Sequence, residues 1–194
     1  ALLGTPGFSD NLLKNHFTLY EGYVKNVNTL AESLEKLTPG TPEYAELKRR
    51  FGWEWNGMRL HELYFGNMSK VPTSLEGLKT PSTSEGPRVS NNNLSDALSK
   101  FWGSPDAWLK DFKATGTMRG IGWTILYHDS ETKKLFNVWV NEHDMGHLAG
   151  CTPLLVLDVF EHAYMNDYGL KRADYIEAFI KAIDWATVEK RFRV

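Results

Sequence analysis

The sequence has one cysteine, Cys151, and it lacks both long apolar runs and a large excess of charge of either sign. A single cysteine excludes an intramolecular disulfide and a zinc site built from several thiolates. No apolar run approaches the roughly 18 residues that a membrane-spanning helix needs, so we expect no membrane span. The 22 Lys and Arg against 24 Asp and Glu leave a formal net charge of −2. That balance predicts neither nucleic acid nor a membrane surface as a partner.

The first ten residues, ALLGTPGFSD, lack the basic start and the long apolar stretch of a signal peptide. Together with the single cysteine, this predicts a cytoplasmic protein. The sequence begins at Ala1 rather than at a methionine, which leaves a removed leader open as an alternative.

Aromatic residues, by contrast, are abundant. The 194 residues include 7 Trp, 8 Tyr and 10 Phe, and the hydrophobic and charged shares of 42% and 24% are typical of a globular protein. A chain of this length forms one large domain or two small ones and can bury a core without disulfides. We therefore expect a dense aromatic core.

The first third of the chain predicts two long helices. In residues 9–36 the apolar and aromatic positions recur every three or four residues, and Ser9 or Asp10 is a suitable N-cap. Residues 37–44 contain two prolines and a glycine and predict a loop. A second helix is expected from Pro42 to about Met68. Two long helices joined by a short loop predict an antiparallel helical hairpin.

The rest of the chain changes character. Residues 69–92 are rich in Ser, Pro and Gly and predict a connector, and residues 93–115 predict helix with a break near Gly103. We place a domain boundary in the connector. The prediction is an N-terminal helical hairpin domain over 1–88 and a C-terminal α/β domain over 89–194.

Three segments of the C-terminal half predict strands. Residues 121–128 and 134–141 are β-branched and aromatic and flank a turn, as in a β-hairpin. Residues 153–160 form an apolar run broken by Asp158, which is typical of a strand buried on both faces. The tail, 161–194, predicts short helices. The fold class is therefore α+β, with a small antiparallel sheet of about three strands.

Asp158 is the first candidate for chemistry, because a carboxylate in an apolar strand is costly unless it has a partner. One interpretation is that it ends the strand and caps the next helix. The other is that it pairs with His162, four residues later, so that both point at one centre.

His16 and His61 lie on the apolar faces of the two predicted helices. Each could be a hydrogen-bonded core residue. If the two meet across the hairpin beside Asp158 and His162, they supply three imidazoles and one carboxylate, a donor set that suits iron, manganese or zinc. His143 and His147 precede the buried strand and are either solvated or hold a ligand of that centre. His128, next to the turn, is expected at the surface.

Four segments carry a resemblance to one family. LDVFEHAYMNDYG (157–169) resembles the D-x-W-E-H-A-Y-Y signature of the iron/manganese superoxide dismutases. WNGMRLHELYF (55–65) resembles the family's second metal-bearing helix, GIGWTILYH (120–128) its G-x-G-W strand, and KRADYIEAFIKAIDW (171–185) its C-terminal helices. The resemblance covers essentially the whole chain in order.

The resemblance implies one iron or manganese ion per subunit, held by His16, His61, Asp158 and His162. It implies disproportionation of superoxide to oxygen and hydrogen peroxide by a metal that cycles between its +2 and +3 states. Many members use a Gln to bond the metal-bound solvent. Here the corresponding helix position is Gly57 and the loop position is His143, so His143 is expected in this role.

The resemblance also implies a tyrosine that gates the site and relays protons. Tyr23 matches by context but lies seven residues after His16, where the family usually has eight. One residue changes the helical phase by about 100°, so either Tyr23 or Tyr20 is expected to act. The expected cavity residues are Trp123, Tyr64 and Phe160.

Arg172 is expected to attract the superoxide anion, because positive charge near a cavity mouth raises association rates, with a solvated helix-end arginine as the alternative. Glu161 implies a homodimer, because in the family this Glu bonds the ligand His of the other subunit. In the family a second pair of residues joins the two subunits. Here the corresponding positions are Tyr20 and Met165. His143 and Val156 favour iron over manganese.

Two other functions remain as alternatives. An iron-dependent oxygenase would keep the metal but prefers two His and one carboxylate with open positions. A non-catalytic binding module on the same fold would need none of the four ligands, and all four are present.

Overall fold

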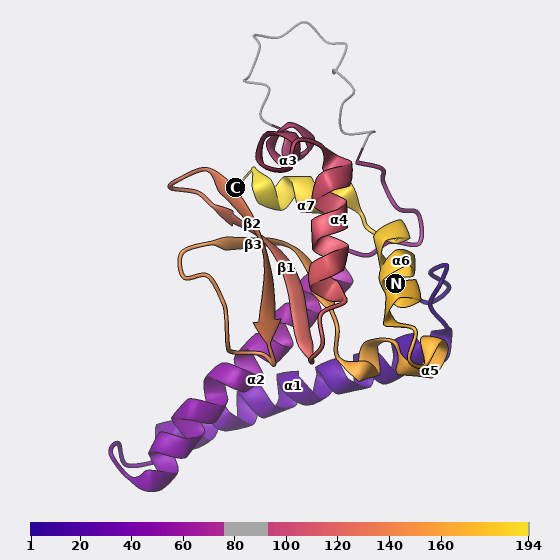
Figure 1. Ribbon diagram of the computed structural model, residues 1–194. Coiled ribbons are helices and arrows are strands. Elements are labelled where there is room, and N and C mark those ends of the chain that lie inside the picture. Colours follow the sequence, from indigo (N-terminus) through magenta and orange to yellow (C-terminus); the bar gives the residue numbers. More distant parts are fainter. Residues whose placement is uncertain (76–92, 194) are drawn as a thin grey trace, which may run out of the picture.

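The computed structural model describes residues 1–75 and 93–193. Its first part is the predicted antiparallel hairpin of α1 (Asp10–Lys36) and α2 (Pro42–Gly66), which extends well beyond the sheet (Figure 1). The Ser9 hydroxyl caps α1 by accepting from the Leu12 amide, and Thr41 caps α2 in the same way. The expected Ser9 cap is confirmed, and α2 ends two residues earlier than predicted.

The sheet consists of β1 (Gly122–Asp129), β2 (Lys134–Asn141) and β3 (Thr152–Asp158), in the antiparallel order β2-β1-β3. Trp123 of β1 is opposite Asp158 of β3, which brings an aromatic wall next to the carboxylate. β3 lies at the edge of the sheet and yet is buried from Leu154 to Asp158. It is covered because α2 and α7 (Trp185–Phe192) pack against it.

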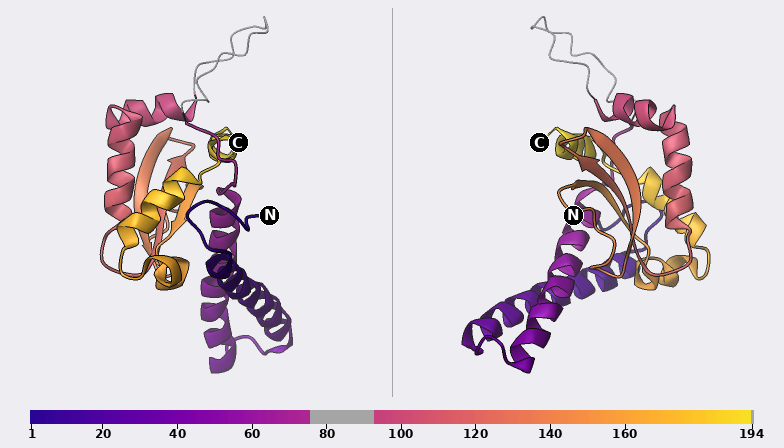
Figure 2. Two further views of the ribbon diagram at one scale, coloured as in Figure 1. Left: turned by 90° about the vertical axis from the view of Figure 1, so that its right-hand side faces the viewer. Right: turned by 60° about the vertical axis from the view of Figure 1, so that its left-hand side comes forward.

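The helices after the connector cover the sheet and complete the core. α3 (Leu94–Trp102) ends at Gly103, which has a φ of 85°, and α4 (Pro105–Gly116) starts from the Ser104 cap. The predicted break is therefore confirmed. Figure 2 shows α4 and α2 on opposite sides of the sheet. The tail forms the 3₁₀ turn η2 (Glu161–Ala163), α5 (Met165–Tyr168), α6 (Arg172–Lys181) and α7.

Partly buried polar contacts join the first and last parts of the chain. The Arg191 guanidinium on α7 donates to the carbonyls of Leu63 and Leu154 and to the side-chain oxygen of Asn67. Most of the predicted connector and the boundary at residues 88 and 89 lie outside the described residues, so the two-domain division stays a prediction. None of the helices in residues 1–75 and 93–193 combines the length and apolar character needed to cross a membrane.

One surface prediction is wrong. His128 is buried, because Phe192 of α7 covers this end of β1 with its ring centroid 4.8 Å from that of the imidazole. The turn predicted after residue 128 marks the end of the strand correctly. It gives no sign of α7, the helix that packs over this end of β1.

Candidate metal centre

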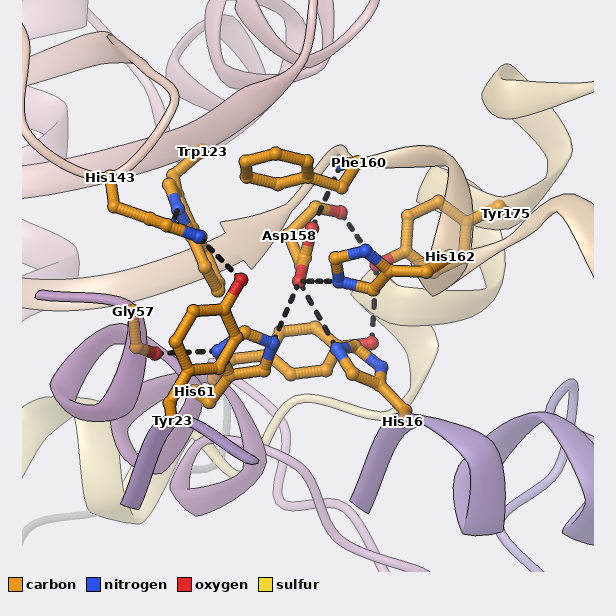
Figure 3. A network of polar contacts seen from close by, with 11 residues as sticks. His16, Tyr23, Gly57, His61, Trp123, His143, Asp158, Phe160, His162 and Tyr175 are labelled. Carbon is orange, nitrogen blue, oxygen red and sulfur yellow. Dashed lines mark hydrogen bonds and ion pairs between the residues drawn. The ribbon is translucent and has the colours of Figure 1, made fainter. Parts of the chain in front are cut away.

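Four side chains from four separate elements converge on one point. They come from α1 (His16), α2 (His61), the end of β3 (Asp158) and η2 (His162). Their ligand-capable atoms all lie within 4.8 Å of one another. The Oδ2 atom of Asp158 is 3.1 Å from Nε2 of His16, 3.6 Å from Nε2 of His61 and 3.2 Å from Nε2 of His162 (Figure 3).

Asp158 ends the strand and also faces the histidines, but it does not cap the next helical turn, whose N-cap is Phe160 and has no side-chain cap hydrogen bond among the described residues. Oδ1 of Asp158 accepts from the Phe160 amide at 2.8 Å and so shapes the turn that follows the strand. Its Oδ2 faces the histidines. The Tyr175 hydroxyl donates to the Asp158 carbonyl at 2.7 Å, and the Tyr64 hydroxyl lies 3.1 Å from that of Tyr175. Asp158 is therefore held at three points. Its carbonyl oxygen accepts from Tyr175, its Oδ1 accepts from the Phe160 amide, and its Oδ2 faces the imidazoles.

The electrostatics favour neutral rings at His16 and His61 beside an ionised carboxylate. Burial lowers the pKa of His61 to about 3 and also lowers the pKa of His16, although Asp158 opposes both shifts. Burial favours a raised pKa for Asp158, but the imidazoles of His162 and His16 prevail and hold the pKa of that carboxyl well below its usual range. For His162 burial acts to lower the pKa, and Asp158 outweighs it and raises the pKa. At neutral pH, His16 and His61 thus keep a lone pair free.

His61 shows most directly that the cluster fits a cation. Its Nδ1 lies 2.6 Å from the Gly57 carbonyl, which can only accept, so Nδ1 carries the proton. Its Nε2 is then a bare lone pair, buried and without a hydrogen-bond partner among the described residues. A lone pair that faces a carboxylate is unfavourable unless a positive charge lies between them. Three imidazole nitrogens and one carboxylate oxygen, without thiolate, suit a transition metal such as iron or manganese.

His143 lies beside the cluster in a fixed orientation. The Trp123 indole donates to its Nδ1 at 3.0 Å, and its Nε2 lies 2.7 Å from the Tyr23 hydroxyl. Since an indole can only donate, Nδ1 is the acceptor and the proton of the neutral ring is on Nε2. Burial lowers the pKa of His143 to about 4, so the neutral ring is the form present at physiological pH. His143 therefore donates to Tyr23.

The structure separates the two candidate tyrosines. The Tyr23 ring stacks on His61, with ring centroids 5.1 Å apart and an interplanar angle of 30°. The Tyr20 hydroxyl is instead 3.1 Å from the Glu62 carboxylate. Tyr23 thus belongs to the polar network around the cluster, and Tyr20 lies to one side of it.

The expected aromatic residues enclose the cluster. Ring centroids are 5.0 Å apart for Trp123 and His61, 5.2 Å for Tyr64 and His16, and 5.2 Å for Phe160 and His162. Sequence reasoning missed Trp53, whose ring packs edge-on against His143 at 4.4 Å. Trp53 lies eight residues before His61, which is about two helical turns along α2. This spacing could have indicated that its ring lies near the cluster.

The remaining candidates lie farther out. The Arg172 guanidinium donates to the carbonyls of Gly116, Met118 and Gly120, at the end of α4 and in the following loop. Anion guidance by Arg172 stays a prediction. Glu161 is exposed beside His162, whose side chain is 26% exposed.

Comparisons with known proteins agree with this geometry. The family model of iron/manganese superoxide dismutases, C-terminal domain, matches residues 90–191. Superoxide dismutase [Mn] 2 of Haloferax volcanii is 34% identical over 192 residues, covering 96% of this chain and 88% of the relative. Superoxide dismutase [Fe] of Sulfolobus acidocaldarius is 32% identical over 195 residues (97% and 87%), and superoxide dismutase [Fe] of Cupriavidus metallidurans is 34% identical over 192 residues (96% and 89%).

The relatives are similar over nearly their full length, and the matched C-terminal region contains Asp158 and His162. The helical hairpin, the three-stranded sheet and the buried donor cluster lie in the order that the sequence resemblance implied. The chain therefore belongs to the iron/manganese superoxide dismutase family.

Proposed function

We propose that the protein is a superoxide dismutase that converts two superoxide ions and two protons into one oxygen and one hydrogen peroxide. The observation that carries the proposal is the convergence of His16, His61, Asp158 and His162, with the bare His61 Nε2 directed at the same point. These four residues would hold one iron or manganese ion. When bound, this ion supplies one-electron redox chemistry between its +2 and +3 states.

The residues around the ligands would control water and protons. Trp123, Tyr64 and Phe160 enclose the cluster and limit the entry of bulk water. His143 donates through Nε2 to the Tyr23 oxygen, so the phenolic proton of Tyr23 is free to point at a substrate. Burial raises the pKa of Tyr23 well above its usual range, helped by the charges of Asp158 and Glu54. Tyr23 thus keeps a proton to give as peroxide forms.

We expect the ion to be iron, because family members that have a histidine at the position of His143 more often use iron. The relatives include proteins named for either metal, and both metals take nitrogen and oxygen ligands. An iron-dependent oxygenase is the weaker alternative, because four protein donors leave fewer open positions than two His and one carboxylate. A non-catalytic module is weaker still, because all four donors are retained.

The decisive experiment is elemental analysis of the purified protein together with a superoxide-disproportionation assay, repeated after the metal-free protein is reloaded with iron or manganese. About one equivalent of metal per chain is expected, with activity that follows the metal. Metal without dismutase activity would favour the oxygenase alternative. Neither metal nor activity after reloading would leave the binding module.

A homodimer is part of the proposal. His162 is a candidate ligand and yet 26% exposed, with the exposed Glu161 carboxylate and the 43% exposed Met165 next to it. A second subunit seated here would cover the ligand and let Glu161 reach its partner's site. Light scattering should then give twice the 22.1 kDa of one chain, and a mass of 22.1 kDa at micromolar concentration would contradict the dimer. The cytoplasmic location stays a prediction.

A further inference from the structure

We infer that His147, itself held by Tyr127, is the residue that positions His143 for its role beside the metal. The inference rests on the proposed function, since it assigns a task within the same site. Neither His147 nor Tyr127 is a candidate ligand, and both act only through His143.

The loop after β2 brings His147 back onto His143. Asn141 and Met145 exchange backbone hydrogen bonds of 2.8 and 3.3 Å, which closes a tight loop. Glu142 has a φ of 49° and Gly146 a φ of 104°, both in the left-handed region. After Gly146 the chain turns back, and Nε2 of His147 lies 2.8 Å from the carbonyl oxygen of His143.

The chemistry of the groups fixes the direction of each hydrogen bond. The His143 carbonyl can only accept, so Nε2 of His147 carries a proton. In the neutral ring Nδ1 is then an acceptor, and it lies 2.7 Å from the Tyr127 hydroxyl. Tyr127 is buried, and burial raises its pKa to about 12, so its hydroxyl keeps the proton that it donates. The result is a chain of two hydrogen bonds, from Tyr127 to His147 and from His147 to the His143 carbonyl.

β1 thereby holds His143 at two points. Trp123 and Tyr127 are four residues apart on this strand and point to the same face. Trp123 donates to the ring of His143, and Tyr127 acts through His147 on its backbone carbonyl. With both ends fixed, Nε2 of His143 is aimed at the Tyr23 hydroxyl. Loss of the backbone anchor should let the loop rotate and misdirect this nitrogen.

The test compares three variants and one control variant with the wild-type protein, all in the metal-loaded form. His147→Leu and Tyr127→Phe break the chain at different points. His147→Gln keeps one donor and one acceptor and should restore it. The matched control is His128→Leu, the same substitution at a buried histidine that points to the other face of β1 and packs against Phe192. The measurements are the midpoint potential of the bound metal, its visible absorption spectrum, kcat/KM and thermal stability.

We expect His147→Leu and Tyr127→Phe to shift the midpoint potential of the bound metal. Both should also lower kcat/KM about 10-fold, which is the smaller end of the range of losses when a residue that orients metal ligands is replaced. His147→Gln and His128→Leu should stay within about 2-fold of the wild type. Unchanged potentials in both disrupting variants, or a glutamine variant as impaired as the leucine variant, would overturn the inference. A loaded wild-type protein without dismutase activity would instead overturn the proposed function, and the potentials would still be measurable.

Discussion

Asp158→Asn should abolish metal binding, lower dismutase activity by at least about 100-fold, and leave a folded protein. The carboxylate supplies the only negative charge among the four converging donors, and it is completely buried. Without it, the three imidazoles would face a di- or trivalent cation with no negative charge to balance it. The asparagine can still accept from the Phe160 amide, as Oδ1 does in the native chain. The turn after β3 should therefore persist.

The metal-free Asp158→Asn variant should also unfold at a lower temperature than the metal-free wild type. In the native chain, despite burial, His162 and His16 hold the pKa of the Asp158 carboxyl below its usual range, so the ionised carboxylate stabilises the fold at neutral pH, and the neutral amide loses that contribution. Calorimetry of both metal-free proteins measures this, alongside metal content and activity. Asp184→Asn is the matched control, because Asp184 bonds Thr73 and Thr187 away from the cluster. A fully loaded and active Asp158→Asn variant would refute the ligand assignment.

The four converging residues could be predicted because each carried a local signal. His16 and His61 follow the helical period of apolar residues, and Asp158 interrupts a strand four residues before His162. The start of α1 could be predicted as well, since Ser9 is a capping residue whose effect depends only on the next turn. Such short-range patterns do not depend on how distant segments pack.

The residues that sequence reasoning missed or left open depend on tertiary contacts. That Tyr23 rather than Tyr20 contacts His143 follows from packing against α2 and the loop after β2, which periodicity along α1 cannot reveal. The role of His147 arises from two left-handed backbone positions in an irregular loop. The apolar run of β3 correctly predicts a strand buried on both faces. It does not reveal that β3 lies at the edge of the sheet, which depends on the order of strand pairing, or that α2 and α7 cover it.

Gly57→Ala should destabilise the protein and lower its activity, because the Tyr23 ring occupies the space that a side chain at position 57 would need. A Cβ there would lie 2.6 Å from both Cδ1 and Cε1 of Tyr23, far inside van der Waals contact. Overpacking of this kind typically costs about 1–3 kcal/mol. The ring should move off His61 and lose the 2.7 Å hydrogen bond to His143. We expect a fall in kcat/KM of roughly 10-fold or more, as for other residues outside the ligands.

Gly52→Ala on the same helix separates this steric effect from the ordinary effect of removing a helical glycine. Gly52 is exposed, and a Cβ there would meet no described atom within 4 Å. Alanine should therefore raise the free energy of unfolding by up to about 1 kcal/mol at position 52 through helix propensity alone. The same gain is available at position 57, so a loss there measures the clash with Tyr23. If both variants were equally stable and fully active, Tyr23 would not need the space above Gly57.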